Sequence, residues 1–299
     1  MATFKSWVKA YRLRTLPLAL SVILTGSFLA IQEDVYNWWV IGLALLTTLF
    51  IQILSNLAND YGDSLKGTDN NERVGPQRTV QSGEISRESM KKAIILFASL
   101  SLLSGVALLY FSFGDIFKLS LLFFVMGLAS IWAAVKYTVG DNAYGYSGFG
   151  DLFVFIFFGL VGVVGSYFLN THTISAEVFL PASAMGLFSA GVLNLNNMRD
   201  IDNDIRSGKH TVASRLGIVD AKKYHLILII FGWILLLAWM MLQKNHPERL
   251  ILLVAMPFFI FDLFKVLHAK QNAALDPYLR KLALKTLLVA FLFGLSILL

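Results

Sequence analysis

The chain has 299 residues, of which 57% are hydrophobic and only 15% are charged, whereas a soluble domain carries about a quarter charged residues. This composition excludes an ordinary soluble domain and predicts a polytopic helical membrane protein. The chain contains no cysteine, which excludes disulfides, thiol nucleophiles and thiolate metal sites.

Long apolar runs, separated by short charged stretches, follow one another along the chain. Because about 20 helical residues cross a hydrocarbon core of roughly 30 Å, each run predicts one transmembrane helix. We expect an all-α bundle of nine transmembrane helices that forms a single domain over residues 1–299. In chain order, the predicted spans are 15–32, 37–58, 93–113, 116–136, 151–169, 178–198, 224–242, 249–268 and 282–299.

The basic residues are distributed unevenly between the two ends of these predicted helices. With the N-terminus in the cytoplasm, all but three of the 25 Lys and Arg residues lie on the cytoplasmic side, the exceptions being Lys118, Lys244 and Arg249. The positive-inside rule therefore predicts a cytoplasmic N-terminus and an external C-terminus, and we expect a bacterial inner membrane. The isoelectric point near 9.4 indicates anchoring to anionic membrane lipid. Neither nucleic acid nor a protein partner is expected, because the basic residues are spread along one membrane face.

The second apolar run ends in an acidic segment that continues into a loop of about residues 59–92. Its polar side chains are spaced by four and then three residues, so they line one stripe of a helix end. These residues are Asn56, Asp60 and Asp63.

The sixth apolar run ends in a second acidic segment, which continues into a loop of about residues 199–223. Asp200 and Asp204 follow Asn196 or Asn197 with similar spacing, whereas Asp202 is expected to point elsewhere. The two segments begin Asn-Leu-Ala-Asn and Asn-Leu-Asn-Asn. This similarity is explained by an internal duplication, and equally by an independent need for polar residues at each helix end.

Two facing stripes of this kind would bring four carboxylates into one pocket. Two carboxylates about 4 Å apart repel by roughly 4 kcal/mol at an effective dielectric of 20, so a pocket under the membrane surface requires a cation. Mg²⁺ suits these donors, because it prefers oxygen ligands and bridges one or two carboxylates to phosphates. The sequence therefore predicts a magnesium–diphosphate site, with separately solvated helix ends as the alternative.

Basic side chains are interleaved with these carboxylates and are candidates for binding the remaining diphosphate oxygens. The three that adjoin the acidic stripes are Lys66, Arg199 and Lys209. Further along the same loops lie Arg73, Arg78 and Arg206. For each of them, positive-inside anchoring is the alternative interpretation.

The stretch of residues 136–151, between the fourth and fifth runs, is rich in Gly and Tyr. Aromatic side chains here, such as Tyr137, are candidates for stabilising a carbocation, although interfacial tyrosines are also ordinary membrane anchors.

Two further patterns predict packing rather than chemistry. In the sixth run, Gly186 belongs to a series of small residues at a stride of four, which predicts a close approach of helices. In the eighth run, Asp262 and Lys265 are three residues apart, which predicts an ion pair on the helix surface, with a substrate contact as the alternative.

The acidic segments resemble the two Asp-rich motifs of the UbiA-type intramembrane prenyltransferases, and the resemblance covers nearly the whole chain. The stretches that carry it are Arg14-Thr-Leu-Pro-Leu, the segment from Asn59 to Asp69, Gly75-Pro-Gln-Arg78, and the segment from Asn196 to Thr211. The chain is most similar to the branch that prenylates 1,4-dihydroxy-2-naphthoate. Gly67 stands where many members place a third Asp, and the next acid is Asp69. Asp141 stands where Pro is expected, which affects the shape of that loop.

The resemblance implies a nine-helix enzyme that uses Mg²⁺ to join a polyprenyl diphosphate to an aromatic acceptor. For the naphthoate branch of menaquinone biosynthesis, it also implies loss of CO₂ together with diphosphate. The implied metal ligands are Asp60, Asp63, Asp200, Asp204 and Asn56. The implied catalytic residues are these four aspartates with Lys66, Arg199 and Lys209. The implied substrate-binding residues are Asn56, Asn59, Asp69, Arg78, Tyr137 and Asn197.

Two alternatives to this function remain. The nearest is the same reaction on another acceptor, such as 4-hydroxybenzoate, homogentisate or a haem, which the Gly67 and Asp69 pattern disfavours. A transporter is more remote, because it would place ionisable residues near the bilayer midplane, whereas these spans carry almost no charge there.

Overall fold

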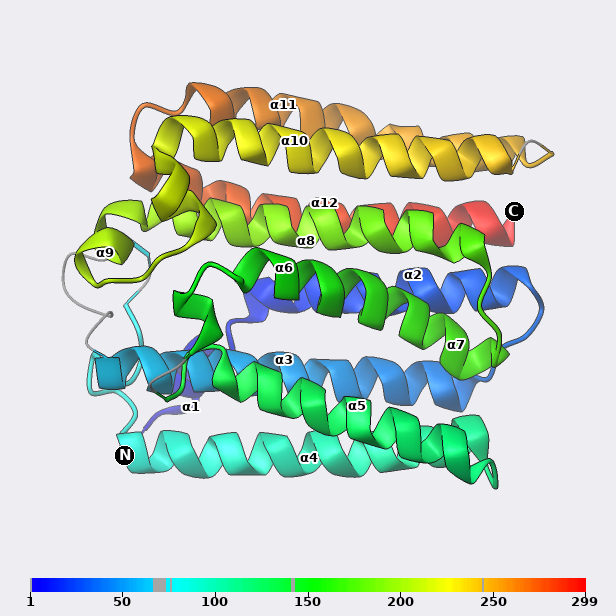
Figure 1. Ribbon diagram of the computed structural model, residues 1–299, viewed down its shortest axis with the longest axis horizontal. Helices are drawn as coiled ribbons and strands as arrows, with labels where there is room; N and C mark the ends of the chain where they lie inside the picture. Colours follow the sequence, from blue (N-terminus) through cyan, green and yellow to red (C-terminus); the bar gives the residue numbers. More distant parts are fainter. Residues whose placement is uncertain (1, 67–73, 76, 141–142, 244) are drawn as a thin grey trace.

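The computed structural model describes residues 2–66, 74–75, 77–140, 143–243 and 245–299, and these form helices without a strand (Figure 1). The α-helices are α1 (Phe4–Tyr11), α2 (Leu16–Gln32), α3 (Trp38–Lys66), α4 (Arg87–Phe113), α5 (Phe117–Lys136), α6 (Gly150–Val154), α7 (Gly165–Thr171), α8 (Phe179–Arg199), α9 (Ile201–Arg206), α10 (Val212–Leu242), α11 (Met256–His268) and α12 (Asp276–Leu298). The remaining helical segments are η1 (Leu13–Thr15), η2 (Tyr144–Tyr146), η3 (Phe155–Val164), η4 (Ala176–Val178), η5 (Pro247–Ala255) and η6 (Asn272–Leu275).

Nine helical segments in the described part of the chain are long and apolar enough to cross a membrane, which confirms the prediction from hydropathy. The long helices lie side by side along the longest axis of the molecule (Figure 1). The N-terminus lies at one end of the bundle and the C-terminus at the other. The end of α3 and the short helix α9 carry parts of the two acidic segments. Both lie at the end of the bundle that holds the N-terminus (Figure 1).

Several helices are longer than their apolar runs. Helix α3 continues from the predicted end at residue 58 to Lys66, and α10 begins at Val212 rather than at residue 224. Hydropathy marks where the hydrocarbon ends, but backbone hydrogen bonding carries the helix on into the aqueous layer. The acidic stripe of the first segment therefore lies on a regular helix rather than in a loop.

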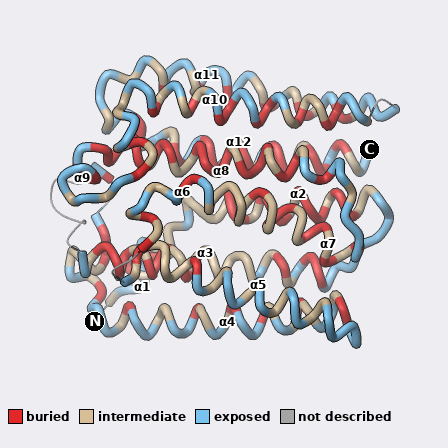
Figure 2. Tube along the Cα trace, viewed as in Figure 1, coloured by how far each residue is buried: buried red, intermediate tan, exposed pale blue. Residues whose placement is uncertain are grey.

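The core consists of two clusters of buried apolar side chains. The larger cluster joins α2, α8, α10, α11 and α12, and the smaller joins α1, α3 and α4. Helix α8 contributes many of the buried residues and lies in the interior of the bundle (Figure 2).

Small residues allow the close approach predicted for the sixth span. A Cβ atom on Gly159 of η3 would lie 2.8 Å from the carbonyl oxygen of Ala182 and 2.9 Å from Cα of Gly186, both in α8. A Cβ on Gly26 of α2 would likewise collide with the Val163 carbonyl oxygen of η3. Glycine at these positions lets three helices meet backbone to backbone.

The fifth span contains a π-helical segment, η3, between α6 and α7. Its turns are closed by hydrogen bonds from residue i to i+5 and therefore hold more residues than α-helical turns. Phe153 in α6 and Phe157 and Val161 in η3 are spaced four residues apart, so they stay near one face of the span, and all three line the cavity described below.

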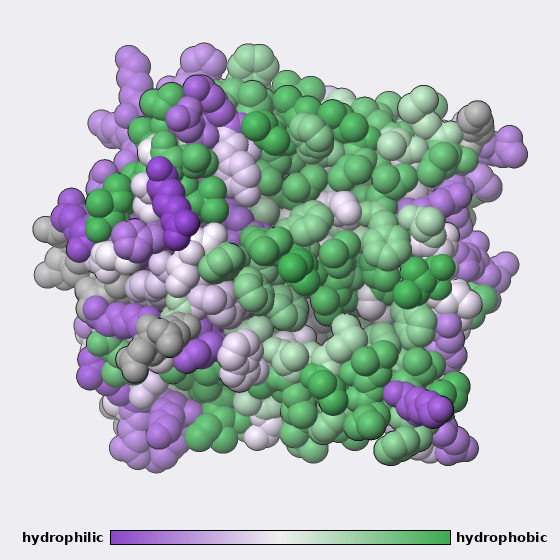
Figure 3. All heavy atoms as spheres, viewed as in Figure 1, coloured by the Kyte–Doolittle hydropathy of each residue, from purple (hydrophilic) through white to green (hydrophobic). Residues whose placement is uncertain are grey.

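The face of the bundle seen in Figure 3 is apolar over the middle of its length and polar at the two ends. At the end opposite the acidic segments, Trp38, Trp39 and Phe117 are exposed, as in the aromatic belts at membrane interfaces. This surface is the one expected of a protein embedded in lipid.

The predicted ion pair between Asp262 and Lys265 is wrong. Oδ2 of Asp262 lies 2.9 Å from Nζ of Lys285 in α12, and Nζ of Lys265 lies over the ring of Phe261 at 4.1 Å from its centroid. Asp262 faces the neighbouring helix, so a cation from that helix reaches it in place of one from its own helix.

Candidate functional site

A cavity of about 730 Å³ lies between helices of the two core clusters and is walled by α2, α3, α4, α5, the α6–η3–α7 span and α8. Along α3 its lining runs from Ala44 to Asp63, about 28 Å of helix. The cavity therefore extends through most of the depth of a bilayer. Its lining is mainly apolar towards Ala44, and clustered charges line it towards Asp63.

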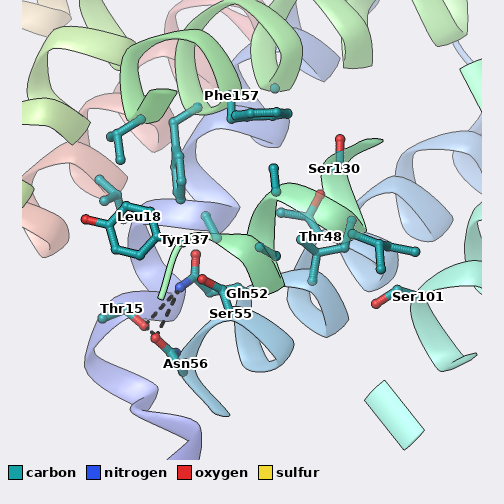
Figure 4. Close-up of a pocket in the computed structure, with 18 of the residues that line it drawn as sticks. Thr15, Leu18, Thr48, Gln52, Ser55, Asn56, Ser101, Ser130, Tyr137 and Phe157 are labelled. Carbon is teal, nitrogen blue, oxygen red and sulfur yellow. Dashed lines mark hydrogen bonds between the residues drawn. The ribbon is translucent and has the colours of Figure 1, made fainter. Parts of the chain in front are cut away.

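Helix α3 carries a polar stripe along this cavity. Thr48, Gln52, Asn56 and Asn59 recur every three or four residues and all line it. Asn56 is fixed by two hydrogen bonds from its Nδ2 atom, to the Thr15 hydroxyl at 2.9 Å and to a backbone carbonyl oxygen at 3.0 Å. Figure 4 shows Gln52, Asn56 and Thr15 converging at the cavity wall.

Aromatic rings from the fourth and fifth spans form another wall of the cavity: Tyr137, Tyr144, Phe153 and Phe157. Tyr137 meets Tyr144 edge to face, and Tyr144 lies 4.2 Å from Phe153 between ring centroids. Burial raises the pKa of both tyrosines, that of Tyr144 to about 12. Both side chains therefore stay neutral and present their rings or hydroxyl groups, without charge, to whatever occupies the cavity.

Asp60 is buried at the charged end, where it accepts three hydrogen bonds from the loop that precedes α4. The Thr79 hydroxyl and backbone N–H donate to Oδ2 at 2.6 and 3.1 Å, and the Val80 N–H donates to Oδ1 at 3.3 Å. This carboxylate therefore fixes the loop of residues 77–86 against the end of α3.

Asp63, one turn further along α3, is also buried and has two identified partners. The Tyr146 hydroxyl donates to Oδ1 at 2.6 Å, and Nη2 of Arg78 lies 3.1 Å from Oδ2. Asp63 thus joins the loop before α4 to the turn between α5 and α6.

In the second acidic segment, Arg199 is fully buried at the end of α8. Its guanidinium contacts Asp200 Oδ2 and Asp276 Oδ1, each at 2.5 Å, and Asn196 Oδ1 at 3.0 Å. A Cβ on Gly75 would lie 2.5 Å from its Nη2 atom, so the loop from the first segment packs on this arginine. A direct contact between Arg199 and diphosphate stays a prediction.

Asp204 lies on α9 and is buried beside Lys209, whose Nζ atom is 3.6 Å from Oδ1. Burial raises the pKa of Asp204 to about 6, with further contributions from the charges of Asp200 and Asp63 that Lys209 partly offsets. Asp63 of the first segment and Lys209 of the second both line the cavity and both contact Tyr146, so the two segments meet at this end. Asp202, by contrast, is exposed, as its position in the sequence predicts.

Seven of the predicted site residues line the cavity: Asn56, Asn59, Asp60, Asp63, Arg78, Tyr137 and Lys209. Five others lie beside its charged end rather than in its lining: Lys66, Asn197, Arg199, Asp200 and Asp204. Asp69 lies outside the described residues, as do Gly67, Arg73 and Asp141. Sequence reasoning did not single out Thr79, Tyr146 or Asp276, because each acts through a tertiary contact with an aspartate or arginine.

The oxygen atoms at this end fit a divalent cation. Oδ1 of Asn197 and Oδ2 of Asp204 are buried acceptors without a hydrogen-bond partner in the part of the chain that the structure describes, an arrangement that a cation would satisfy. Among the same residues, no three acidic or histidine side chains are grouped closely enough to hold one ion. The protein would then supply one or two carboxylates per ion, with phosphate and water completing the shell, as is usual for Mg²⁺.

Fold and site together define a polytopic helical membrane protein with a membrane-deep cavity whose charged end gathers carboxylates and basic groups. The chain belongs to the UbiA prenyltransferase family, whose sequence pattern matches residues 19–296.

Several curated relatives match over nearly their full length. The chain is 41% identical to the 1,4-dihydroxy-2-naphthoate octaprenyltransferase of Haemophilus influenzae, over 98% of this chain and 96% of the relative. It is 39% identical to the protein of the same name from Escherichia coli, over 98% and 95%, and 34% identical to that of Mycobacterium tuberculosis, over 97% and 96%.

Two solved structures share the fold. A UbiA homologue from Aeropyrum pernix in its apo form superposes with a TM-score of 0.69 at 16% identity, over 96% of this chain and 98% of the other. A UbiA homologue from Archaeoglobus fulgidus bound to DMAPP and Mg²⁺ superposes with a TM-score of 0.60 at 17% identity, over 95% and 98%. The arrangement of membrane-crossing helices in the described part of the chain is therefore that of the UbiA intramembrane prenyltransferases.

Proposed function

We propose that this protein transfers a polyprenyl group from polyprenyl diphosphate to 1,4-dihydroxy-2-naphthoate, with loss of CO₂ and diphosphate, giving demethylmenaquinone in its reduced, quinol form. The relatives that match over nearly their whole length carry this acceptor in their names. The observation that carries the proposal is the cavity, which joins a charged end to an apolar interior as deep as the bilayer. Such a cavity suits a substrate with a diphosphate head and a long hydrocarbon tail.

The donor set favours Mg²⁺ as cofactor, and the structural neighbour from Archaeoglobus fulgidus was solved with DMAPP and Mg²⁺. The carboxylates that would hold the metal are Asp60, Asp63, Asp200 and Asp204, with the amide oxygens of Asn56 and Asn197 nearby. When bound, Mg²⁺ would stabilise negative charge developing on the diphosphate leaving group.

The basic side chains at the same end supply the rest of the electrostatic stabilisation. Arg78 and Lys209 line the cavity, and Lys66 lies beside them. Guanidinium and ammonium groups directed at phosphate oxygens favour the ionised leaving group over the intact ester, so they lower the barrier to breaking the allylic C–O bond.

The wall formed by Tyr137, Tyr144, Phe153 and Phe157 accounts for the fate of the prenyl group. Its ring faces would stabilise the allylic cation by cation–π interaction. The ring carbon of the acceptor that bears the carboxylate attacks this cation and forms the new C–C bond. Loss of CO₂ from that carbon then restores the aromatic ring. The apolar remainder of the cavity holds the tail.

The charge asymmetry and the fold support an orientation in which the N-terminus and the acidic segments face the cytoplasm of a bacterial cell, with residues 1–299 acting as one domain. Because the chain has no cysteine, single-cysteine labelling tests this orientation. A membrane-impermeant maleimide should label Lys118→Cys in intact cells and Glu88→Cys only after the cells are opened. The reverse pattern would invert the proposed topology.

The function is tested by assaying the purified protein with a polyprenyl diphosphate, Mg²⁺ and a panel of acceptors. The masses of the lipid products are then measured by mass spectrometry. With 1,4-dihydroxy-2-naphthoate, the product should have the mass of acceptor plus prenyl group less CO₂. A product formed only from 4-hydroxybenzoate or homogentisate would reassign the acceptor. Formation of no prenylated product from any acceptor would contradict the proposal as a whole.

A further inference from the structure

Tyr146 lies in the short turn η2 between α5 and α6, where residues of both acidic segments surround it. Neighbouring contacts fix the turn itself: the Gly145 N–H donates to the Tyr137 carbonyl oxygen at 3.0 Å, and the Tyr144 hydroxyl donates to the Ala133 carbonyl oxygen at 2.9 Å. The turn that carries Tyr146 is therefore fixed against the end of α5.

Three contacts of the Tyr146 side chain with charged groups are identified among the described residues. Its hydroxyl donates to Oδ1 of Asp63 at 2.6 Å. Nζ of Lys66 lies over its ring at 3.9 Å from the centroid, and Nζ of Lys209 lies over the ring at 5.7 Å. Asp63 and Lys66 belong to the first acidic segment and Lys209 to the second, so one tyrosine contacts both.

The backbone of Tyr146 adds a fourth link, because its carbonyl oxygen accepts a hydrogen bond from the His210 N–H at 3.0 Å. This ties the turn directly to the segment that follows α9. Tyr146 therefore links the end of α3 to the loop before α10 through its side chain and its backbone.

These contacts have different physical effects. A lysine ammonium is a mobile point charge on a flexible stem, and a ring face within about 6 Å attracts it and limits the positions it samples. The hydroxyl forms a charge-assisted hydrogen bond that orients one oxygen of Asp63, while Arg78 lies on the other oxygen. The ring therefore acts on the two ammonium groups, and the hydroxyl acts on the carboxylate.

We propose that Tyr146 is a positioning residue that presets the diphosphate site. Its ring holds Lys66 and Lys209 where both can reach the phosphate oxygens of one substrate, and its hydroxyl orients Asp63 for a divalent cation. This inference rests on the proposed function, because it assumes that a diphosphate binds at this end of the cavity. It divides the contribution of Tyr146 into a ring part and a hydroxyl part that substitutions can separate.

The test measures binding rather than turnover. Inorganic pyrophosphate is titrated into the purified protein by calorimetry at a series of Mg²⁺ concentrations, for the wild type, Tyr146→Phe and Tyr146→Leu. Tyr146→Phe keeps the ring, so its affinity for pyrophosphate at saturating Mg²⁺ should stay within about twofold, whereas the Mg²⁺ concentration for half-maximal binding should rise several-fold. Tyr146→Leu should in addition bind pyrophosphate about tenfold more weakly even at saturating Mg²⁺.

The matched control is Phe149→Leu, which removes an exposed ring from the same stretch. This control should leave unchanged both the affinity for pyrophosphate and the Mg²⁺ concentration for half-maximal binding. Should Tyr146→Leu fold poorly, Tyr146→Met removes the ring with less loss of side-chain length and gives the same comparison. Equal effects of the Phe and Leu substitutions, or no effect of either, would overturn the proposal.

The outcomes separate this inference from the proposed function. If the wild type binds pyrophosphate with Mg²⁺ and both Tyr146 variants bind it equally well, the inference on Tyr146 fails and the proposed function stands. If the wild type binds no pyrophosphate at any Mg²⁺ concentration, both fail. Transfer to a different aromatic acceptor would change the proposed function alone, because the binding test uses no acceptor.

Discussion

Asp60 and Thr79 are joined by two hydrogen bonds, from the threonine N–H at 3.1 Å and from its hydroxyl at 2.6 Å, both to Oδ2 of the aspartate. The pair fixes the loop that carries Arg78 against the end of α3. The same carboxylate is a proposed metal ligand. Asp60 therefore has a structural role beside the catalytic role proposed for it, and different substitutions can separate the two.

Removing the Thr79 hydroxyl should destabilise the charged end of the cavity. Thr79→Val keeps the shape of the side chain but leaves the buried Asp60 carboxylate without one charge-assisted hydrogen bond, at a cost of about 1.5–3 kcal/mol. The measurement is the thermal unfolding midpoint in detergent. Thr79→Ser, which restores a hydroxyl, should recover most of the loss, and an unchanged midpoint in Thr79→Val would contradict this role of the pair.

Replacing Asp60 or Asp200 with Ala should abolish prenyl transfer while the protein remains folded in detergent. Each substitution removes a carboxylate from the proposed metal site, which electrostatic catalysis requires. Turnover with saturating substrate is compared with that of Asp202→Ala, an exposed acid of the same segment, which should keep wild-type activity. Wild-type rates in Asp60→Ala or Asp200→Ala would remove that residue from the site.

Removing divalent metal should stop the reaction. Chelation with EDTA leaves the clustered carboxylates without the cation that offsets their repulsion and stabilises the leaving group. Prenyl transfer should fall to background and should return when Mg²⁺ is added in excess over the chelator. Activity that persists in EDTA would contradict the magnesium site.

Adding a methyl group at Gly62 should disturb the contact between α3 and the residues after α5. A Cβ there would lie 2.8 Å from the carbonyl carbon and oxygen of Thr138, and the backbone cannot yield as a flexible side chain can. We expect Gly62→Ala to lower the free energy of unfolding by about 1–3 kcal/mol. Gly42→Ala on the same helix meets nothing within 4 Å and serves as the control.

Filling the apolar part of the cavity should discriminate between prenyl chain lengths. Gly127 of α5 lines the cavity, and a Cβ there would have no neighbour within 4 Å. A ring in Gly127→Phe would occupy space proposed for the tail, so activity with a long polyprenyl diphosphate should fall at least about tenfold while a C10 or C15 donor is still used. Gly42→Phe, outside the cavity, should leave the preference unchanged. An equal loss with all donors would indicate a general defect instead.

Local features of the sequence predict much of the architecture and several members of the site. Length and hydropathy predict the nine spans, because hydrocarbon thickness and helical rise together set the number of apolar residues that one span needs. The spacing of Asn56, Asp60 and Asp63 predicts their common face, because helical periodicity acts within a few residues. Hydropathy does not predict how far α3 continues beyond the membrane, since that end is stabilised by contacts such as Asp60 with Thr79.

The sequence did not predict side-chain partners that come from distant parts of the chain. Lys285 rather than Lys265 reaches Asp262, because packing of α11 on α12 decides which cation lies nearest. Asp276, 77 residues away along the chain, pairs with Arg199. The sequence alone determined that this is a nine-span membrane protein with two acidic helix ends, since those features follow from short-range periodicity and composition. Only the tertiary structure decided that Tyr146 lies between the two ends, because long-range packing of α3, α9 and the η2 turn sets that contact.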